Sequence, residues 1–550
     1  MTKKWFRIGI AGVFLMSLAL RFWGLERFNT LVFDEVYFAK FGNNYLTHTP
    51  FFNAHPPLSQ YMIGIGIWLG SHIPFWHDTV NGLTGSLRSP WTYRWFNALT
   101  GSIIPVIVAA IAYQLSYRRS FALLAGFFTA CDGLFLVESR YALSNIYIII
   151  FGLLGHWFLL LALDNQNQRR SFWLVLAGIN FGASVGTKWN GLWFLFGAYL
   201  IWITAWIIQA IHSFSNSKLI PSLDMGHGRL GIGQAAGVGG RGTEGRSMEG
   251  VGGVGREGGI NSLSPHTPHT PHTPHTPHTP HTSPSPHLPI SPSQTPLQNL
   301  TQLNVFQMFF YLGIIPAFIY SIIWIPHLQL DKTYGFIAVH QQILKFHLHL
   351  GGNSSDVHPY CAPWYKWPLM TRPMAYYYQT AGSINEPLPV MGPPLPAGAE
   401  KVIYDVHAMG NPFLWWFGVA AILFLMGMLV SQALIPWVKG ERFSVPATLS
   451  VDTWIALYLV INYAANLLPW VKVTRCVFIY HYMCAVVFVF LAIAWFVDQC
   501  LRSYYQQLRA VGVTITFIIL AALIFWMPVY LGLPLSHDGY WLRMWFRSWV

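Results

Sequence analysis

The sequence predicts an all-α protein that crosses a membrane many times, with about eleven transmembrane helices. Two observations of composition predict this fold class. Of the 550 residues, 53% are hydrophobic and only 9% are charged, whereas soluble domains average about 25% charged residues. Trp, Tyr and Phe, which favour the membrane–water boundary, number 25, 26 and 39. A third observation is a series of long apolar runs, which define the elements in order.

These apolar runs have the length that a membrane-spanning helix needs, about 17–25 residues. They lie near residues 8–24, 93–115, 119–138, 142–163, 171–187, 190–213, 304–326, 412–434, 451–470, 476–497 and 509–532. A further apolar stretch, 57–70, is too short to span a bilayer. We expect it to form a helix in or near the membrane interface.

The charge pattern predicts how the chain is oriented. Lys3, Lys4 and Arg7 precede the first apolar run, and no small-residue cleavage site follows it, which indicates a retained signal anchor with a cytoplasmic N-terminus. Most basic residues of the short loops then lie in the cytoplasm, where positive charge is favoured. Arg140, Lys188, Lys472 and Arg475 are exceptions, because this topology puts them in outer loops.

Three long loops divide the chain. Residues 25–92 and 327–411 are expected outside, while residues 214–303 are expected inside as a disordered insertion, Gly-rich and then built of Pro-His-Thr repeats. A solvated segment is the simplest interpretation of the repeats, although their histidines could bind a metal loosely. The predicted organisation is an N-terminal transmembrane catalytic half (1–213), the insertion, and a C-terminal transmembrane half (304–550).

Composition and motifs exclude several functions. The net charge of +12 fits anionic lipid headgroups better than nucleic acid, since no soluble basic domain is present. The five cysteines are scattered without a Cys-x-x-Cys pair and indicate neither a disulfide framework nor a zinc site. No phosphate-binding loop or dinucleotide fingerprint occurs in a supporting context. We assign no metal site, and leave open a divalent cation.

Asp34 and Glu35 directly follow the first predicted span. Carboxylates are costly near a bilayer and are rare there unless they are functional. One interpretation is that the pair caps an interfacial helix, since Asp near a helix start accepts bonds from free backbone N–H groups. The other is a general base, which a weakly nucleophilic Ser or Thr hydroxyl requires when it attacks.

Other polar residues on the same side also have two interpretations. His55 precedes two prolines and either belongs to a rigid helix entry or contacts the carboxylates or a substrate; His481 is either structural or a ligand. The outer cations either extend to lipid headgroups or bind a phosphate group. Those cations are Arg94, Arg140, Lys188, Lys472 and Arg475. Arg372 lies in an aromatic stretch, 364–378, that suits a membrane anchor or a carbohydrate site.

Several motifs, taken together and in order, resemble those of protein O-mannosyltransferases. They are FDEVYFAKFGNNYL, FFNAHPPL, TYRWFNALTGSIIPV, GTKWNGLW, WPLMTRPMAYYY, GNPFLWW and FIYHYM. The resemblance covers most of the chain except 214–303. The chain looks like a bacterial member, because the eukaryotic enzymes insert a large β-trefoil domain in the second long outer loop and 327–411 is too short to hold it.

The resemblance implies a type C glycosyltransferase fold with the site facing the periplasm of a bacterial inner membrane. The donor would be a polyprenyl-phosphate mannose and the acceptor a Ser or Thr of an exported protein. By motif match, Asp34 would be the catalytic carboxylate and Glu35 its partner in acceptor binding, while Tyr45, Arg94 and Lys188 would contact the lipid phosphate. Further candidates for substrate binding are His55, Arg140, Arg372, Arg475 and His481.

One departure from the family concerns ESRYALSN, where the family commonly has an acidic residue at the position of Asn145.

The working hypothesis that follows from the resemblance is inverting transfer of mannose from a lipid-phosphate carrier to protein hydroxyls, with Asp34 as general base. One alternative is a glycosyltransferase with a lipid acceptor, of the lipid A aminoarabinose type. Another is a membrane transporter, for which Asp132 and Gly133 in the third span are the best mid-membrane candidates. The oligomeric state is left open.

Overall fold

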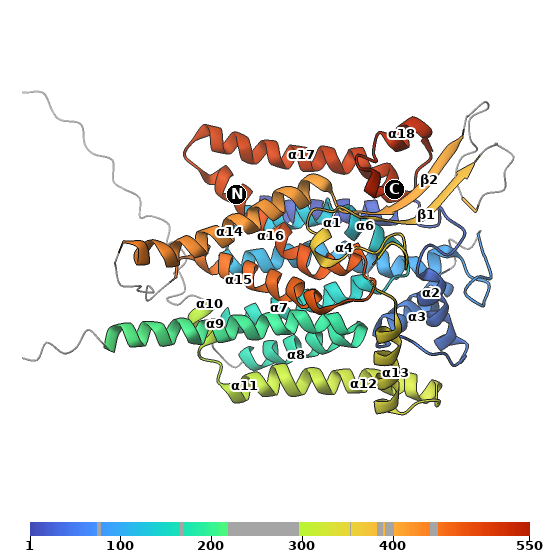
Figure 1. Ribbon diagram of the computed structural model, residues 1–550, viewed down its shortest axis with the longest axis horizontal. Helices are drawn as coiled ribbons and strands as arrows, with labels where there is room; N and C mark the ends of the chain where they lie inside the picture. The colour runs from blue at the N-terminus through green and yellow to red at the C-terminus, as the bar shows by residue number, and fades with distance from the viewer. Residues whose placement is uncertain are drawn as a thin grey trace, which may run out of the picture. The chain divides into compact units, whose positions relative to one another are not determined.

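The computed structural model (Figure 1) describes residues 1–73, 79–164, 169–217, 296–352, 354–381, 389–390, 401–439 and 449–550. The described residues of Met1–Ser217 and Gln294–Val550 form one compact unit. Everything below concerns this unit. The predicted disordered insertion with its Pro-His-Thr repeats lies almost entirely outside the described residues.

Helices dominate the described residues, and nine of these helical segments are long and apolar enough to cross a membrane. They are α1 (Lys3–Phe22), α4 (Pro90–Ser116), α7 (Asn145–Asp164), η1 with α9 (Trp189–Gly191, Leu192–Ser217), α11 through η2 to α12 (Val305–Phe309, Phe310–Ile314, Ile315–Leu330), α14 (Pro412–Val438), α15 with η4 (Val451–Leu467, Leu468–Lys472), η5 with α16 (Ile479–Tyr482, Met483–Arg502) and α17 (Gln506–Leu531). The predicted polytopic all-α fold is confirmed.

The remaining two predicted spans are also helical. The run 119–138 forms two helices, α5 (Arg119–Ala130) and α6 (Gly133–Arg140), with a bend of 59° between them. The run 171–187 forms α8 (Arg169–Thr187), a helix of 19 residues that is less apolar than the nine. α8 packs along α7 and α12, so it belongs to the same bundle.

Asp132 explains the bend between α5 and α6. Its carboxylate accepts hydrogen bonds from the backbone N–H groups of Phe135 (2.9 Å) and Asn411 (3.1 Å) and from the indole N–H of Trp415 (2.7 Å). It therefore caps α6 and ties the break to the start of α14. A carboxylate fully engaged in this way offers no support for the transporter alternative.

α16 is the centre of the bundle. Nearly every residue from Met483 to Val497 is buried, and the helix packs against α5, α14, α15 and α17. A helix that is apolar on all sides is stable only when it is surrounded by other helices. Helices at the periphery of the bundle leave their outer sides exposed, with apolar residues such as Phe306, Phe318 and Phe517, as expected for surfaces that face lipid.

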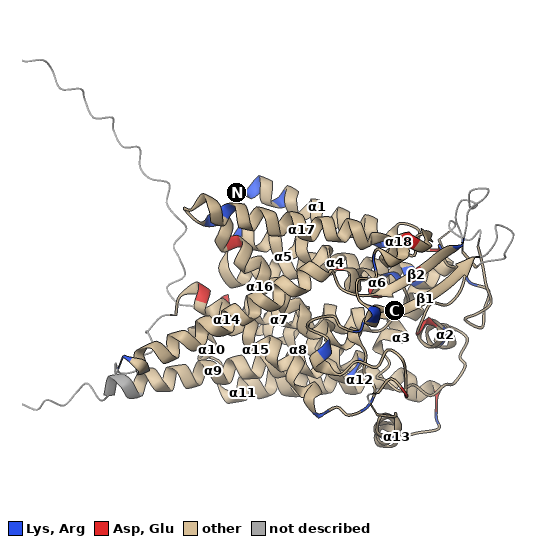
Figure 2. Cartoon of the chain, turned by 45° about the horizontal axis from the view of Figure 1, so that its top comes forward, with Lys and Arg blue, Asp and Glu red and all other residues tan. Residues whose placement is uncertain are grey.

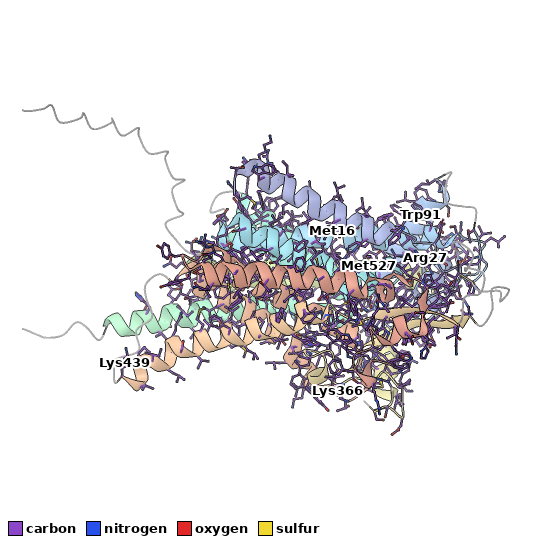
Figure 3. All side chains as sticks on the ribbon, turned by 90° about the horizontal axis from the view of Figure 1, so that it is seen from above. Met16, Arg27, Trp91, Lys366, Lys439 and Met527 are labelled. Atoms are coloured by element: carbon purple, nitrogen blue, oxygen red, sulfur yellow. A yellow bond between two sulfur atoms is a disulfide. The ribbon has the colours of Figure 1, made fainter. Side chains whose placement is uncertain are left out.

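The two ends of the bundle differ (Figure 1). The N-terminus, the end of α9 and the short α10 (Pro296–Leu300) lie toward one end. α2 (Glu35–Leu46), α3 (Leu58–Ser71) and α13 (Phe336–His349), from the two long loops, lie at the other. Figure 2 shows Lys, Arg, Asp and Glu gathered toward the two ends, and Figure 3 shows Arg27 and Lys439 at opposite ends. The helices of the two long loops thus lie at the end of the bundle opposite the N-terminus.

The first long loop contains the expected short helix. The predicted helix 57–70 corresponds to α3, and its 14 residues are too few to span a bilayer. Pro56 and Pro57 precede it, and the N–H groups of a first helical turn need no partners inside the helix, so proline is tolerated there. α3 packs between α2 and α4, and thereby fixes α2 at this end of the bundle.

A small antiparallel sheet at the same end was not predicted. β1 (Met374–Ala381) pairs with β2 (Val402–Ala408), and β2 pairs with β3 (Leu535–Ser536). The stretch 364–378, which includes the first part of β1, suggests only membrane-anchoring or carbohydrate-binding aromatics, although aromatic residues also favour strands. Three short helices complete the described fold at this end: η3 (Trp364–Lys366), α18 (His537–Trp541) and η6 (Arg547–Trp549).

Candidate functional site

A cavity of about 570 Å³ opens at the end of the bundle that carries the long loops. Its walls come from the start of α2, the segment before α3, the connection between α8 and α9, α13, and the segment before α16. Five residues predicted for the site line it: Asp34, His55, Lys188, Arg475 and His481. Segments that are far apart in sequence thus bring one acid and two strong cations together.

Asp34 stands at the N-cap position of α2, yet its side chain makes no capping hydrogen bond. The capping interpretation of this residue is therefore wrong within the described structure. Burial raises the pKa of the Asp34 carboxyl to about 6, an effect that the positive charge of Lys188 opposes. A carboxylate that makes no capping hydrogen bond to its helix and has a pKa near neutrality is suited to act as a general base.

The backbone immediately before Asp34 is strained. Phe33 has a φ of +52°, a left-handed conformation that is costly for a residue with a bulky side chain. Its ring stacks on that of Tyr376, with the centroids 4.0 Å apart and the planes at 13°. This stacking holds the turn that aims Asp34 into the cavity.

Glu35 does not line the cavity, contrary to the expected role in acceptor binding. It is fully buried, and its carboxylate accepts hydrogen bonds from the backbone N–H groups of Val32 (2.8 Å) and Ala142 (2.9 Å). Arg94 completes the set with two bonds, Nε to Oε1 at 2.9 Å and Nη2 to Oε2 at 2.8 Å. Glu35 is thus an anchor that positions its neighbour, Asp34.

Arg94 is likewise not available to a phosphate. Besides Glu35, its guanidinium donates to the carbonyl oxygens of Leu25, Phe28 and Thr30, and the side chain is wholly buried. All its donors therefore serve to fold the chain between α1 and α2 against α4. The expectation that Arg94 contacts the donor phosphate is corrected, because the local backbone supplies enough acceptors to engage it fully.

Arg140 and Arg372 also bind backbone rather than the cavity. Arg140 donates to four carbonyl oxygens at the C-terminal end of α1, from Leu20 to Gly24. This is a favourable place for a cation, since the carbonyl groups of a last helical turn lack partners. Arg372 donates to Pro359, Ser548 and Val550 and so fastens the C-terminal segment. Neither position supports the expected substrate contact.

Tyr45 lies outside the cavity as well. Its hydroxyl forms a hydrogen bond of 2.7 Å with Nδ1 of His327, and the residue lines a separate groove of about 720 Å³ between α2, α3 and α12. A contact with the same phosphate as Lys188 is therefore not supported. Tyr45 lies three turns of α2 beyond Asp34, about 16 Å further along the helix axis, and this displacement brings it to α12 rather than to the cavity.

The remaining wall of the cavity is rich in histidine. His347 and His358 line it together with His55 and His481, and the rings of His55 and His347 lie 5.2 Å apart. Burial and then the charge of Lys188 lower the pKa of His55 well below 6.5, while burial, Arg475 and Lys188 lower that of His347 to about 4. The rings of His55 and His347 are therefore neutral hydrogen-bonding groups at pH 7. Sequence reasoning missed His347 and His358 because nothing in a long loop indicated their direction.

A disulfide joins Cys361 to Cys476, which the scattered cysteines did not indicate. The two residues are 115 positions apart, so their spacing gave no signal. Next to the bridge, the backbone N–H of Cys476 donates to Gly351 (2.9 Å) and that of Ala362 to Val477 (2.8 Å). The bridge fastens the second long loop beside Arg475, at the wall of the cavity.

Metal binding finds no support in the described residues, among which no group of three or more His, Cys, Asp or Glu side chains is arranged to hold an ion. The histidines of the Pro-His-Thr repeats lie outside the described residues. The chemistry that this cavity can perform with its own residues is acid–base chemistry by Asp34 and anion binding by Lys188 and Arg475.

Comparisons with known proteins identify similar sequences and folds. Residues 12–223 match the family model described as dolichyl-phosphate-mannose-protein mannosyltransferase, and residues 332–549 match the C-terminal four-transmembrane region of protein O-mannosyltransferase. A polyprenol-phosphate-mannose–protein mannosyltransferase of Mycolicibacterium smegmatis is 22% identical over 94% of this chain and 88% of its own length. Protein O-mannosyl-transferase 2 of Danio rerio is 28% identical over 33% of this chain and 25% of its own.

Among solved structures, the Saccharomyces cerevisiae Pmt1–Pmt2 complex bound to its sugar donor is similar, with a TM-score of 0.69 and 13% identity over 100% of this chain and 93% of that one. The fold is therefore that of a multi-pass membrane glycosyltransferase. The two family models together cover most of the sequence on both sides of the insertion. The chain belongs to the protein O-mannosyltransferase family.

The anchoring role of Glu35 and Arg94 is testable through stability. Arg94→Met leaves a buried carboxylate without its cation, so the free energy of unfolding should fall by about 3–5 kcal/mol. Arg502→Met is the matched control: its side chain is 50% exposed and 3.6 Å from Asp498, so its loss should cost less than about 1 kcal/mol. Thermal unfolding in detergent measures both variants, and equal losses would contradict the anchoring role.

The disulfide should support the cavity wall. Cys361→Ser should lower the unfolding free energy by roughly 2–4 kcal/mol and remove the protein's sensitivity to dithiothreitol. Cys500→Ser, which alters a free cysteine, should leave that sensitivity intact. Peptide mass spectrometry without reduction identifies the bridge directly. Free thiols at both Cys361 and Cys476 in protein isolated without reductant would show that the bridge does not form.

Proposed function

We propose that this chain transfers mannose from a polyprenyl-phosphate-mannose donor to Ser or Thr hydroxyls of exported proteins, with inversion at the anomeric carbon. The single observation that carries this proposal is the cavity in which Asp34 faces Lys188 and Arg475. Membership in the protein O-mannosyltransferase family and the name of the mycobacterial relative support the choice of donor and acceptor.

In the proposed reaction, the acceptor hydroxyl oxygen attacks C1 of mannose from the face opposite the phosphate. The C1–oxygen bond to the phosphate breaks as the new C1–oxygen bond forms, and the hydroxyl proton passes to Asp34. The products are the mannosylated hydroxyl and the polyprenyl phosphate. One displacement at C1 inverts its configuration. A general base in this position typically accelerates a reaction by about 10²–10⁴-fold.

The cations act on the leaving group. Lys188 and Arg475 supply positive charge where the departing phosphate gains negative charge, which stabilises the transition state more than the ground state. His55 and His481 add neutral donors; Nδ1 of His481 is bonded to the backbone of Phe478, so Nε2 is the nitrogen presented to a ligand. Charge from arginine and lysine, together with neutral imidazoles, suits a lipid-linked phosphate.

We further propose that the cavity faces the outside of a bacterial plasma membrane and that the N-terminus is cytoplasmic. Two observations support this orientation. The disulfide at the cavity wall suits an oxidising compartment. Basic residues of short segments, including Lys3, Lys4 and Arg118, gather at the end that holds the N-terminus, as positive charge favours in the cytoplasm.

The lipid-acceptor alternative shares the acid-and-cation chemistry but finds less support. Both matched family models describe protein mannosyltransferases. Mass spectrometry of exported proteins from a deletion strain distinguishes the two acceptors: loss of hexose from Ser and Thr residues supports the protein acceptor, and unchanged hexose contradicts it.

The role of Asp34 is tested by Asp34→Asn, which removes the base while retaining size. Transfer of labelled mannose to a Ser/Thr peptide by the purified protein should fall at least about 100-fold, because no proton acceptor remains at the attacking oxygen. Asp538→Asn makes the same change at a fully exposed carboxylate and should retain normal rates. Normal turnover by the Asp34 variant would refute the assignment.

The pH dependence follows from the pKa of Asp34. The base acts when ionised, so kcat/KM should decline as the pH falls through about 6, the value to which burial raises this pKa. Lys188 favours the ionised carboxylate; the residual activity of Lys188→Gln should therefore show its acid limb at higher pH. Lys366→Gln, an exposed change outside the cavity, should leave the limb in place. An unshifted limb in Lys188→Gln would contradict this coupling.

A further inference from the structure

Behind the cavity wall lies a second acid that sequence reasoning did not single out. Glu138, in α6, is completely buried. Its Oε1 accepts hydrogen bonds from the hydroxyl of Tyr376 and from Nδ2 of Asn145 at 3.2 Å. Its Oε2 is buried without a hydrogen-bond partner in the described structure. Burial of a charge is unfavourable unless an opposite charge lies near.

The opposite charge is Lys188, reached through Asn145. The Nζ of Lys188 lies 3.4 Å from Oδ1 of Asn145, while Nδ2 of the same amide points to Glu138. An ammonium only donates and a carboxylate only accepts, so the two ends of the amide are fixed by its partners. The amide dipole is therefore aligned between the anion and the cation.

Tyr376 connects the same carboxylate to Asp34. Its hydroxyl donates to Glu138, and its ring carries the stacked ring of Phe33, the strained residue before Asp34. Lys188 in turn lies over the ring of Tyr480, with Nζ 5.3 Å from the centroid. One buried carboxylate thus contacts the supports of both the proposed base and the proposed phosphate-binding cation.

We propose that Glu138 is a positioning residue of the site. The side-chain amide of Asn145 is hydrogen-bonded to both Glu138 and Lys188, and through it the negative charge of Glu138 holds the ammonium of Lys188 in the cavity. This inference rests on the proposed function only where it predicts a change in KM for polyprenyl-phosphate mannose. Asn145 carries no charge itself, so the carboxylate lies one side chain away from Lys188.

The test removes the negative charge of Glu138 and then restores a negative charge at position 145, beside Lys188. Glu138→Gln retains the shape but not the charge, and the double variant Glu138→Gln/Asn145→Asp puts a carboxylate beside Lys188. Glu138→Gln/Asn44→Asp is the control, because it restores the net charge on α2 outside this network. Thermal unfolding verifies that each variant is folded.

The first measurement does not require mannosyl transfer. An amine-reactive reagent modifies Lys188 at a rate set by its deprotonated fraction, and peptide mass spectrometry across pH reports that fraction. The ionisable groups that face Lys188 are Asp34, Glu138, Arg475, Cys484 and the histidines at 55, 347 and 481. Loss of the Glu138 charge should speed modification, about tenfold for each unit by which the pKa of Lys188 falls.

The second measurement is kinetic. Glu138→Gln should raise KM for polyprenyl-phosphate mannose by about tenfold, equivalent to one pKa unit of lost interaction, with a smaller change in kcat. The Asn145→Asp double variant should bring both the modification rate and KM back toward wild type, whereas the Asn44→Asp double variant should not. If Glu138→Gln does not fold, Asn145→Ala interrupts the same relay and should also speed modification.

The outcomes separate cleanly. An unchanged rate of Lys188 modification in folded Glu138→Gln, or equal rates in the two double variants, overturns the positioning role whatever the activity. Faster modification that Asn145→Asp reverses supports it, even if the protein transfers no mannose. Absence of transfer by the wild-type protein instead contradicts the proposed function alone.

Discussion

The buried pair of Glu35 and Arg94 is the interaction on which the site depends. Arg94 reaches from α4 to the carbonyl oxygens of the segment between α1 and α2, and Glu35 reaches from α2 to the backbone at Val32 and Ala142. Four separate segments therefore meet at two side chains. The two neighbouring carboxylates therefore have different roles: Glu35 is fully hydrogen-bonded within the fold, whereas Asp34 lines the cavity.

Because Glu35 and Arg94 do not line the cavity, the charged residues that do line it carry an excess of positive charge. Asp34 is the acid that lines it, against Lys188 and Arg475, and burial lowers the pKa of His55 and of His347 so that these two rings are neutral at pH 7. A site with surplus cations and many apolar wall residues attracts an anion. The same surplus explains why a carboxylate behind the wall is useful, since it offsets repulsion between Lys188 and Arg475 without occupying the space for a ligand.

Much of this arrangement was predictable, for identifiable reasons. Long apolar runs and the distribution of Lys and Arg determine which loops share a side, so the meeting of Asp34, Lys188 and Arg475 followed from topology. The direction of each side chain did not follow. Arg94 and Arg140 lie as near the membrane boundary as Lys188 does, but they turn toward uncapped or irregular backbone, and sequence does not reveal which carbonyl groups lack partners.

Long-range pairings escaped prediction for a related reason. The partners of β2 and the link between Cys361 and Cys476 depend on how the second long loop folds back over the bundle, which no local spacing records. Tyr376 is a further example: its place in an aromatic stretch suggested a surface role, whereas the strand β1 turns it inward to Glu138. Side chains that act through others are the ones that local motifs describe least well.

The covalent link beside Arg475 has a consequence for biogenesis. A chain that has just been inserted carries two separate thiols in that place, and its cavity wall is complete only after they have been oxidised. In the proposed orientation, enzyme maturation is thereby coupled to the thiol-oxidising capacity of the compartment outside the membrane. Two cells with equal amounts of this polypeptide can then differ in the amount of finished enzyme, according to how readily thiols are oxidised in that compartment.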